Sequence, residues 1–382
     1  MQKATEQDLI RRLLSHIEHG TTDLASHERT VWGTGYTDSE LLRQELQRVL
    51  RARPLIIGHS SQLSEPGDFI TDEVFGLPVV VVRGPDGALR AHVNVCRHRG
   101  ARLVEAASGS GIRAFSCPYH GWGYSLQGDL THVTDGARCF PDLKTAQRGL
   151  LRAHAWEQWG FVWLDANPDA LDGLDGGSSS DRLAPLDGDF DGYRLGDDSA
   201  FGGATLTGAF NWKLGVEAFL EVYHFRSLHP GMRNYVFTPE VAAFDQLGEH
   251  MRLVAPKKEV RDLAKQPSQT WSLRPKATVV YHIFPSTFVF VEKRHSSTLQ
   301  IRPVAVDRSE VRIMHIARED GLRRLSTLER NIELFMRAVG EDIGACESIQ
   351  RGLASVPQEL IFGRNELGIH HFRDNLDRLL DT

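Results

Sequence analysis

The sequence predicts an α+β fold, with a β-rich amino-terminal half and a carboxy-terminal half that combines an antiparallel sheet with long helices. Residues 279–290, 298–306 and 310–317 have the β-branched and aromatic content of successive antiparallel strands. Apolar residues then repeat at helical spacing from Leu322 to Val339, which predicts a long amphipathic helix. Because strands precede helices without βαβ alternation, the pattern favours an antiparallel sheet.

Two helices are expected in the first fifty residues. Residues 5–19 form an apolar face at helical spacing, with Thr5 and Asp8 suited to a capping box and Gly20 suited to end the helix. A second helical pattern covers residues 39–51. We expect this amino-terminal segment to pack on the carboxy-terminal domain.

Four segments are predicted along the 382 residues. They are an amino-terminal helical segment (1–50), a β-rich domain (51–166), a linker or loop (167–199) and an α+β domain (200–382). The linker is predicted from its Asp, Gly and Ser content, which includes Gly176-Gly177-Ser178-Ser179-Ser180.

Composition excludes several classes of protein. A formal charge of −6 without basic runs argues against a nucleic-acid binder. No segment approaches the ~20 apolar residues of a membrane span, and the first residues lack the apolar core of an export signal. Four cysteines do not make a disulfide framework in a chain of this length. We expect Cys139 and Cys346 to be reduced structural thiols in a cytoplasmic protein.

The most informative motif is Cys96-Arg97-His98, followed by Cys117-Pro118-Tyr119-His120. Two loops each supply one thiolate and one imidazole, which is the mixed set that a Rieske [2Fe–2S] cluster requires. A Cys₂His₂ zinc site is the alternative, although zinc fingers usually pair Cys with Cys and His with His. The pattern favours an electron-transfer cluster.

The surrounding segment supports this interpretation. Residues 79–83, a Gly-Pro-Asp-Gly turn and residues 88–95 predict a β-hairpin that leads into the first ligand pair. Residues 54–165 resemble a Rieske domain throughout, including Pro66-Gly67-Asp68-Phe69 and the run around Cys96. The interval between the ligand pairs is slightly long, which suggests an enlarged loop at residues 106–111.

A second metal site is predicted after Asn211-Trp212-Lys213, which opens a helical segment. Glu217, Glu221 and His224 share one face of a continuous helix, whereas His229 would point roughly 140° away from His224 at 3.6 residues per turn. The two histidines converge only if the helix ends or bulges, and Pro230-Gly231 are suitable terminators. Two imidazoles and one carboxylate form the arrangement that binds Fe(II) with open positions. On its own, such a His pair is more often a capping or surface feature.

The whole chain resembles the terminal oxygenase α subunit of the Rieske non-haem iron oxygenases, the aromatic-ring-hydroxylating dioxygenase family. Asn211-Trp212-Lys213, Glu221-Val222-Tyr223-His224 and His229 follow the family motif. The match implies that His224 and His229 bind the mononuclear iron, and that Glu221 and Asn211 are catalytic residues. It also implies a helix-grip-like catalytic domain.

The family's third iron ligand is an Asp shortly before a Gln-Arg-Gly-Leu-like segment. Glu341-Asp342 precedes Gln350-Arg351-Gly352-Leu353 here, so the resemblance assigns Asp342, with Glu341 as the competitor. Asn365-Glu366 and the residues up to Phe372 resemble the family's last helix. His370 and His371 are expected to be packing or surface residues.

The chain departs from the family at Glu221, where most ring dioxygenases have Asp. In the family this carboxylate bridges an iron-binding His and a cluster His of the neighbouring subunit in a head-to-tail trimer. By that match Glu221 links His224 to His120 of the next chain. Relatives that resemble quaternary-ammonium oxygenases also carry Glu at this position, so a carnitine- or betaine-like substrate is the alternative to an aromatic one.

The expected activity is O₂ activation at the His224/His229/Asp342 iron, leading to hydroxylation or oxidative demethylation of a small organic substrate. No Gly-x-Gly-x-x-Gly opens a helix, so NAD(P)H should act through a partner reductase, of the flavin/iron–sulfur type, or a ferredoxin. The rivals are a Rieske electron carrier without oxygenase activity and a zinc-stapled binding module. Substrate-pocket walls are expected from residues 279–290 and from aromatic side chains at Phe219, Phe225, Tyr235 and Phe237.

Overall fold

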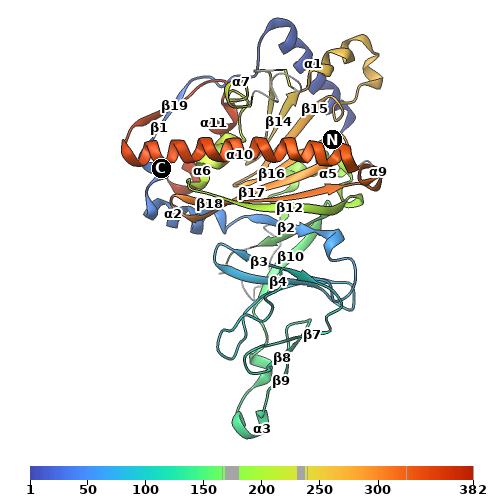
Figure 1. Cartoon of the computed structure of the whole chain (residues 1–382), viewed down its shortest axis with the longest axis vertical. Coiled ribbons are helices and arrows are strands. Elements are labelled where there is room, and N and C mark those ends of the chain that lie inside the picture. Colours follow the sequence, from blue (N-terminus) through green and yellow to red (C-terminus); the bar gives the residue numbers. More distant parts are fainter. Residues whose placement is uncertain (166, 168–179, 230–236, 239, 324, 382) are drawn as a thin grey trace. The chain divides into compact units, whose positions relative to one another are not determined.

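The chain divides into two compact units in a computed structural model, which describes all residues except 166, 168–179, 230–236, 239, 324 and 382 (Figure 1). One unit comprises Met1–Leu50, Pro185–Tyr193 and Phe201–Thr382, and the other comprises Arg51–Ala184 and Arg194–Ala200. No helix among the described residues combines the length and the apolar character that a membrane crossing requires.

The first unit is built on a seven-stranded antiparallel sheet with the order β12-β18-β17-β16-β15-β14-β13. Its strands are β12 (Ser199–Gly208), β13 (Ala243–Leu247), β14 (His250–Pro256), β15 (Ala277–Ile283), β16 (Thr287–Val291), β17 (His295–Ala305) and β18 (Arg308–Ala317). The run at 279–290 is therefore a hairpin of two strands, because residues 284–286 form its turn. The α+β class with an antiparallel sheet is confirmed.

The helices of this unit flank the sheet. They are α1 (Lys3–His19), α2 (Ser39–Glu45), α5 (Asp187–Tyr193), α6 (Trp212–Ala218), α7 (Phe225–Leu228), α9 (Glu319–Leu322), α10 (Leu325–Ser355) and α11 (Leu367–Leu380). The 31-residue α10 crosses the sheet (Figure 1), and the rings of Phe335 on α10 and Phe290 on β16 are 5.1 Å apart. Residues of α10 and of the sheet line a cavity between them.

The amino-terminal helices differ from the sequence prediction at their ends. The first helix begins at Lys3, and its N-cap residue Gln2 makes no side-chain cap, so the capping box at Thr5 and Asp8 was wrong. Lys3 is held in the helix by an ion pair with Glu6 at 2.9 Å. Gly20 ends the helix in the left-handed region at φ 64°, as expected. The second helix is shorter than predicted: α2 ends at Glu45, and a π-helical turn follows at Leu46–Leu50.

A small two-stranded sheet joins the two ends of the chain within this unit. Strand β1 (Arg29–Trp32) pairs antiparallel with β19 (Glu359–Phe362). Arg29 also forms an ion pair with Asp374 of α11 at 2.5 Å. The amino-terminal segment is thereby fixed to the last helix.

The second unit is mainly β over its described residues, with short helical turns between the strands. A seven-stranded sheet has the order β2-β11-β10-β5-β4-β3-β6, and a three-stranded sheet has the order β7-β8-β9. The elements are β2 (Pro54–His59), β3 (Phe69–Val74), β4 (Leu77–Arg83), β5 (Leu89–Val93), β6 (Ser108–Gly109), β7 (Ala114–Ser116), β8 (Gly123–Ser125), β9 (Leu130–His132), α3 (Gly136–Cys139), β10 (Arg152–Gln158) and β11 (Phe161–Asp165). The predicted hairpin is β4–β5, with Val79 opposite Val93.

The segment predicted to be a linker is structured over its described part. Helix α5 lies inside it, and Phe190 and Leu195 are fully buried. These apolar side chains anchor the segment, although its overall composition is that of a loop. Gly176-Gly177-Ser178-Ser179 lie outside the described residues, and Ser180 is helical.

Candidate metal centres and active site

The two predicted cluster loops are structural copies of each other. The backbone N–H of Cys96 donates to the carbonyl of Ala101 at 2.8 Å, and that of Gly100 donates to the carbonyl of Cys96 at 3.0 Å. In the second loop Cys117 N–H donates to Trp122 and Gly121 N–H donates to Cys117, at the same distances. Both glycines adopt positive φ, 79° and 71°, which permits the tight turn around each cysteine.

The four predicted ligands lie together at the tips of these loops. Cys96 and Cys117 are 2% and 3% exposed, and the rings of His98 and His120 are 4.7 Å apart. The indole of Trp122 stacks on His98 at 4.7 Å. The hydroxyl of Tyr124 lies 3.3 Å from the sulfur of Cys96, which supplies a polar contact of the kind that tunes a cluster.

The donor set fits a [2Fe–2S] cluster. The Nδ1 atoms of His98 and His120 are both buried without a hydrogen-bond partner among the described residues. Buried polar atoms are rarely left unpaired, so two unpaired imidazole nitrogens beside two buried thiols indicate a bound group. The Cys₂His₂ composition is that of a Rieske centre.

The predicted iron-binding residues also converge, in the first unit. His224 Nε2 lies 3.2 Å from His229 Nε2, and Asp342 Oδ1 lies 3.0 Å from His229 Nε2 and 3.5 Å from His224 Nε2. Two ligands that bind one metal ion at ~2.1 Å and at right angles lie about 3.0 Å apart. The three donor atoms therefore have the mutual spacing of ligands to a single ion.

The three donors form one compact group. Each of His224, His229 and Asp342 offers one ligand atom, and these atoms all lie within 4.8 Å of one another. This is the spacing of a site that can hold one metal ion.

A helix break brings the two histidines together, which corrects the prediction of one continuous helix. Helix α6 ends at Ala218, and α7 begins only after His224. The carboxylate of Glu221 accepts hydrogen bonds from the backbone N–H groups of Tyr223 and His224. A side-chain acceptor of this kind competes with the helical hydrogen bonds, so the helix does not continue through this stretch. The proposed terminators Pro230 and Gly231 lie outside the described residues.

Each histidine of the triad is held by a carboxylate on its other nitrogen. Glu221 accepts from His224 Nδ1, and Glu341 accepts from His229 Nδ1 at 2.6 Å. The proton therefore lies on Nδ1, and the Nε2 lone pairs of both rings face each other across 3.2 Å. Two facing lone pairs repel each other unless a cation lies between them. Glu341, the competing ligand candidate, thus contacts Nδ1 of His229, whereas Asp342 faces Nε2 of the same ring.

The burial of Asp342 gives a second reason to expect a cation. Its side chain is 5% exposed, and Oδ1 has no partner of hydrogen-bond geometry among the described residues. Burial raises the pKa of Asp342, since the charged carboxylate loses its hydration. Burial also opposes protonation of His229, but the carboxylates of Asp342 and Glu341 outweigh it and raise the pKa of that ring. A divalent cation at this point would stabilise the ionised carboxylate.

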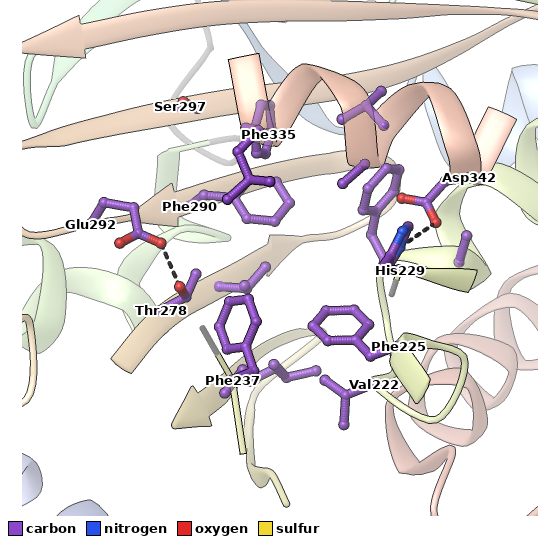
Figure 2. A pocket seen from close by; sticks show the side chains of 18 of the residues that line it. Val222, Phe225, His229, Phe237, Thr278, Phe290, Glu292, Ser297, Phe335 and Asp342 are labelled. Atoms are coloured by element: carbon purple, nitrogen blue, oxygen red, sulfur yellow. Dashed lines mark hydrogen bonds and ion pairs between the residues drawn. The ribbon is translucent and has the colours of Figure 1, made fainter. Parts of the chain in front are cut away.

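The triad lies at one end of a cavity of about 200 Å³ (Figure 2). The cavity is lined by apolar side chains from the sheet, from α10 and from the segment that carries the histidines. They include Phe219, Phe225, Phe237, Val280, Phe290 and Phe335. Phe219, Phe225 and Phe237 therefore lie where the sequence placed them, Tyr235 lies outside the described residues, and Val280 and Phe290 line the cavity from the 279–290 run.

A buried charged network lies under α6, and sequence reasoning did not find it. Lys213 forms an ion pair with Glu45 of α2, which also accepts from the indole N–H of Trp212 at 2.7 Å. One turn later, Glu217 forms an ion pair with Arg373 of α11. Glu217 therefore faces α11, and it does not line the cavity with Glu221. The network fixes the helix that leads into the metal site.

The remaining predicted residues have structural contacts. Asn211 is fully buried and caps α6: its side chain accepts from the Lys213 N–H and donates to the carbonyl of Val306 at 2.8 Å. It does not line the cavity. His370 and His371 bond to the backbone carbonyls of Gly363 and His250, both at 3.1 Å.

The two remaining cysteines lie outside both sites. Cys139 is exposed and Cys346 is buried, and both are free thiols. The thiol of Cys346 donates to the carbonyl of Leu214 at 3.5 Å. Only Cys346 therefore has the buried setting of a structural thiol.

Comparison with known families gives two matches. Residues 53–145 match the Rieske [2Fe-2S] domain, and residues 197–382 match the ring hydroxylating alpha subunit (catalytic domain). Together the two matches contain all nine predicted site residues.

Among curated relatives, the carnitine monooxygenase oxygenase subunit of Acinetobacter baumannii is 28% identical over 355 residues, which cover 90% of this chain and 91% of the relative. The chlorobenzene dioxygenase subunit alpha of Cupriavidus sp. (strain PS12) is 35% identical over 190 residues, which cover 50% of this chain and 42% of the relative. The chain thus matches less than half the length of that dioxygenase subunit.

Solved structures share the fold over nearly the whole chain. A quaternary ammonium Rieske monooxygenase in complex with an inhibitor gives a TM-score of 0.77 at 22% identity, with 98% of each chain covered. Naphthalene 1,2-dioxygenase with indole bound gives 0.75 at 20% identity, with 94% of each chain covered. With a Rieske domain and a ring-hydroxylating catalytic domain on one polypeptide, the chain belongs to the Rieske oxygenase α subunits.

Proposed function

We propose that this chain is the terminal oxygenase component of a Rieske oxygenase system. In this proposal Cys96, His98, Cys117 and His120 bind the [2Fe–2S] cluster, and the triad formed by His224, His229 and Asp342 binds the mononuclear iron. The single observation that carries the proposal is the convergence of three donor atoms at the end of an apolar cavity. An electron carrier without a second activity has no use for such a site.

When bound, the cluster and the iron supply one-electron transfer and O₂ activation, so that a small organic substrate is hydroxylated or oxidatively demethylated. The chain's own residues prepare the site for this chemistry. Glu221 and Glu341 hold the Nδ1 protons of the two histidines and leave both Nε2 atoms unprotonated. The phenylalanine walls exclude water and leave room for an apolar substrate beside the triad.

Glu221 has a second role in the proposal. Its carboxylate binds His224 within the chain, and a carboxylate can accept from two imidazoles at once. We assign the second imidazole to His120 of a neighbouring copy in a homotrimer. Asn211 is a positioning residue, since it caps the helix before the site. The partners are a reductase or ferredoxin that draws on NAD(P)H, and the compartment is the cytoplasm, where the free thiols are stable.

Iron content tests the proposal most directly. The purified protein should hold three irons per chain, two in the cluster and one in the triad. It should also incorporate oxygen from labelled O₂ into product when it is supplied with NADH and a reductase. A result of two irons per chain and no oxygen incorporation would contradict the oxygenase proposal and support the alternative, a Rieske electron carrier without oxygenase activity.

A second candidate is a monooxygenase of quaternary-ammonium compounds. Alignment with the carnitine monooxygenase subunit over about nine tenths of both chains favours it, and so does Glu221 in place of the more common Asp. Formation of an aldehyde from carnitine, with trimethylamine released, would establish this activity. A hydroxylated ring product would establish the first candidate.

A further inference from the structure

The floor of the cavity changes from apolar to polar along the sheet. Alternate residues of one strand face the same side, and cross-strand pairing arranges the cavity side chains in two rows. The first row contains Leu253, Val280, Phe290 and Ser297, and the second contains Ala255, Thr278, Glu292 and His295. Lys257 follows Ala255 by two residues and lies one step beyond the second row, opposite Lys276. The side chains of both rows and of Lys257 line the cavity, and among them charged groups occur only in the second row and at Lys257.

The polar row lies at the end of the cavity away from the metal triad. Figure 2 shows Glu292 and Thr278 on one side of Phe290, and His229 with Asp342 on the other. Helix α10 lines the cavity from Asn331 to Asp342, two residues that are eleven positions and about 16 Å apart at 1.5 Å per residue. The cavity therefore has room for an apolar body between its polar end and the triad.

The charges of the polar end already compensate each other. The ammonium of Lys257 and the hydroxyl of Thr278 both donate to the carboxylate of Glu292. Lys257 would repel a cationic ligand group, and Glu292 would repel an anionic one. This end of the cavity therefore suits an uncharged group better than either ion.

His295 has unused hydrogen-bonding capacity at this end. Its side chain is 5% exposed, and Nδ1 has no partner among the described residues. Burial lowers the pKa of His295, so the ring is neutral near pH 7 and has one donor and one acceptor nitrogen. The hydroxyl of Ser297, by contrast, is already paired with His315 Nδ1 at 2.8 Å. Among the described side chains of the two rows and Lys257, His295 is thus the one with an unpaired polar atom left for a ligand.

We propose that His295, beside the compensated Glu292–Lys257 pair, binds an uncharged oxygen function of the substrate, a hydroxyl or carbonyl, while the apolar body lies against Phe290 and Phe335 near the metal. This inference rests on the proposed function, because it takes the cavity as the substrate site. It narrows the substrate class to apolar ring compounds with a neutral oxygen group, and it excludes quaternary-ammonium substrates.

The test compares four probes with one body. A cavity of about 200 Å³ is smaller than the ~300 Å³ of most drug-sized sites, so we choose a two-ring body: naphthalene, 2-naphthol, 2-naphthoate and N,N,N-trimethyl-2-naphthylammonium. Equilibrium binding to the holoprotein is measured by calorimetry without reductase. We expect 2-naphthol to bind about fivefold more tightly than naphthalene, the effect of one neutral hydrogen bond. Both charged probes should bind more weakly than naphthalene.

Three variants assign the preference to the imidazole. His295→Leu should reduce the naphthol-to-naphthalene ratio to about one and leave naphthalene affinity unchanged within about twofold, because only the hydrogen bond is lost. His295→Gln keeps donors and an acceptor, and it should retain part of the ratio. Ser296→Ala is the matched control, since Ser296 is the next residue of β17 and faces the other side of the sheet. It should keep the full ratio.

Two results would overturn the inference: an undiminished ratio in His295→Leu, or tightest binding of the trimethylammonium probe. Binding requires no turnover, so failure of the proposed function gives a different result. A holoprotein that prefers 2-naphthol through His295 but never consumes O₂ with NADH and reductase upholds this inference and overturns the oxygenase proposal. A protein that oxidises substrates but binds all four probes with the same affinity upholds the oxygenase proposal and overturns this inference.

Discussion

Glu341 accepts a hydrogen bond from Nδ1 of His229 at 2.6 Å, on the edge of the ring opposite the nitrogen that faces Asp342. Successive residues of a helix point about 100° apart, so the two neighbouring carboxylates of α10 contact the two edges of one imidazole. This contact supports the assignment of Asp342, and not Glu341, as the proposed metal ligand. It also gives Glu341 a role of its own, as the residue that orients the ring.

The role of Glu341 predicts a loss of iron affinity without loss of the cluster. Glu341→Ala should weaken binding of the mononuclear iron by about 10–100-fold, because partners that orient a ligating histidine commonly have this effect. Glu333→Ala removes an exposed carboxylate from the same helix and should have no effect. Chelator competition followed by metal analysis measures the change, with cluster absorbance as the internal reference. Equal affinities in the two variants would contradict the assignment.

Removal of the ligand itself should have a stronger effect. Asp342→Ala, His224→Ala or His229→Ala should each lower the iron content from three to two per chain and end turnover, because the site keeps only two of three donors. The visible spectrum of the cluster should remain. If Asp342→Ala retains full iron content and activity, the assignment of Asp342 as the third iron ligand is wrong.

At the cluster, His120→Ala should abolish the Rieske spectrum and electron uptake, since one iron would keep only one of the two imidazoles that a Rieske centre requires. His132→Ala, on the exposed strand β9, is the control and should have the spectrum of the parent protein. Optical and electron paramagnetic resonance spectra of the reduced protein check both variants. A normal cluster of unchanged potential in His120→Ala would refute the ligand assignment.

The bridge proposed for Glu221 predicts a defect in electron transfer. Glu221→Gln keeps the size and one acceptor but loses the charge, so both metal sites and the trimer should persist while cluster reoxidation slows sharply. Glu221→Asp should impair reoxidation less, because only reach is lost. Rapid mixing of the reduced protein with O₂ and substrate measures the rate. Parent-like reoxidation in Glu221→Gln would mean that the carboxylate is not a bridge.

The buried network under α6 predicts a large loss of stability. Lys213→Met leaves the Glu45 carboxylate buried beside one indole N–H, and such an unpaired buried charge costs ~3–5 kcal/mol. The double change Lys213→Met with Glu45→Gln should recover part of this loss, since the neutral amide still accepts from Trp212. Urea unfolding of both variants gives the free energies of unfolding. A double variant no more stable than the single one would contradict this account.

Six of the seven proposed metal ligands could be predicted to lie close together because their spacing in the sequence is local, whereas Asp342 was assigned only by the family resemblance. Cys96 and His98 lie on one tight loop, and so do Cys117 and His120, so chain geometry alone brings each pair together. The same applies to His224 and His229 once the helix ends between them. The position of that break could not be predicted, because it depends on the Glu221 carboxylate bonding to the backbone of Tyr223 and His224.

The polar end of the cavity could not be predicted, because it is assembled by strand register. Lys257, Thr278, Glu292 and His295 come from three loops or strand ends that are separated by up to 38 positions in the sequence. Each looks like an ordinary strand or surface residue in its own segment. Only the pairing of β14, β15, β16 and β17 places them beside one another. The ion pairs of Lys213 and Glu217 depend in the same way on α2 and α11.

Helix α10 carries Phe335 and Asp342 on one rigid element, and this limits how such an enzyme can change during evolution. One residue inserted between them would turn the aspartate by about 100° and move it 1.5 Å along the axis, out of reach of both histidines. The distance from the cavity wall to the metal is therefore inherited as a fixed length. New substrate preferences must arise by exchange of side chains along this stretch, and directed-evolution libraries should keep its length constant.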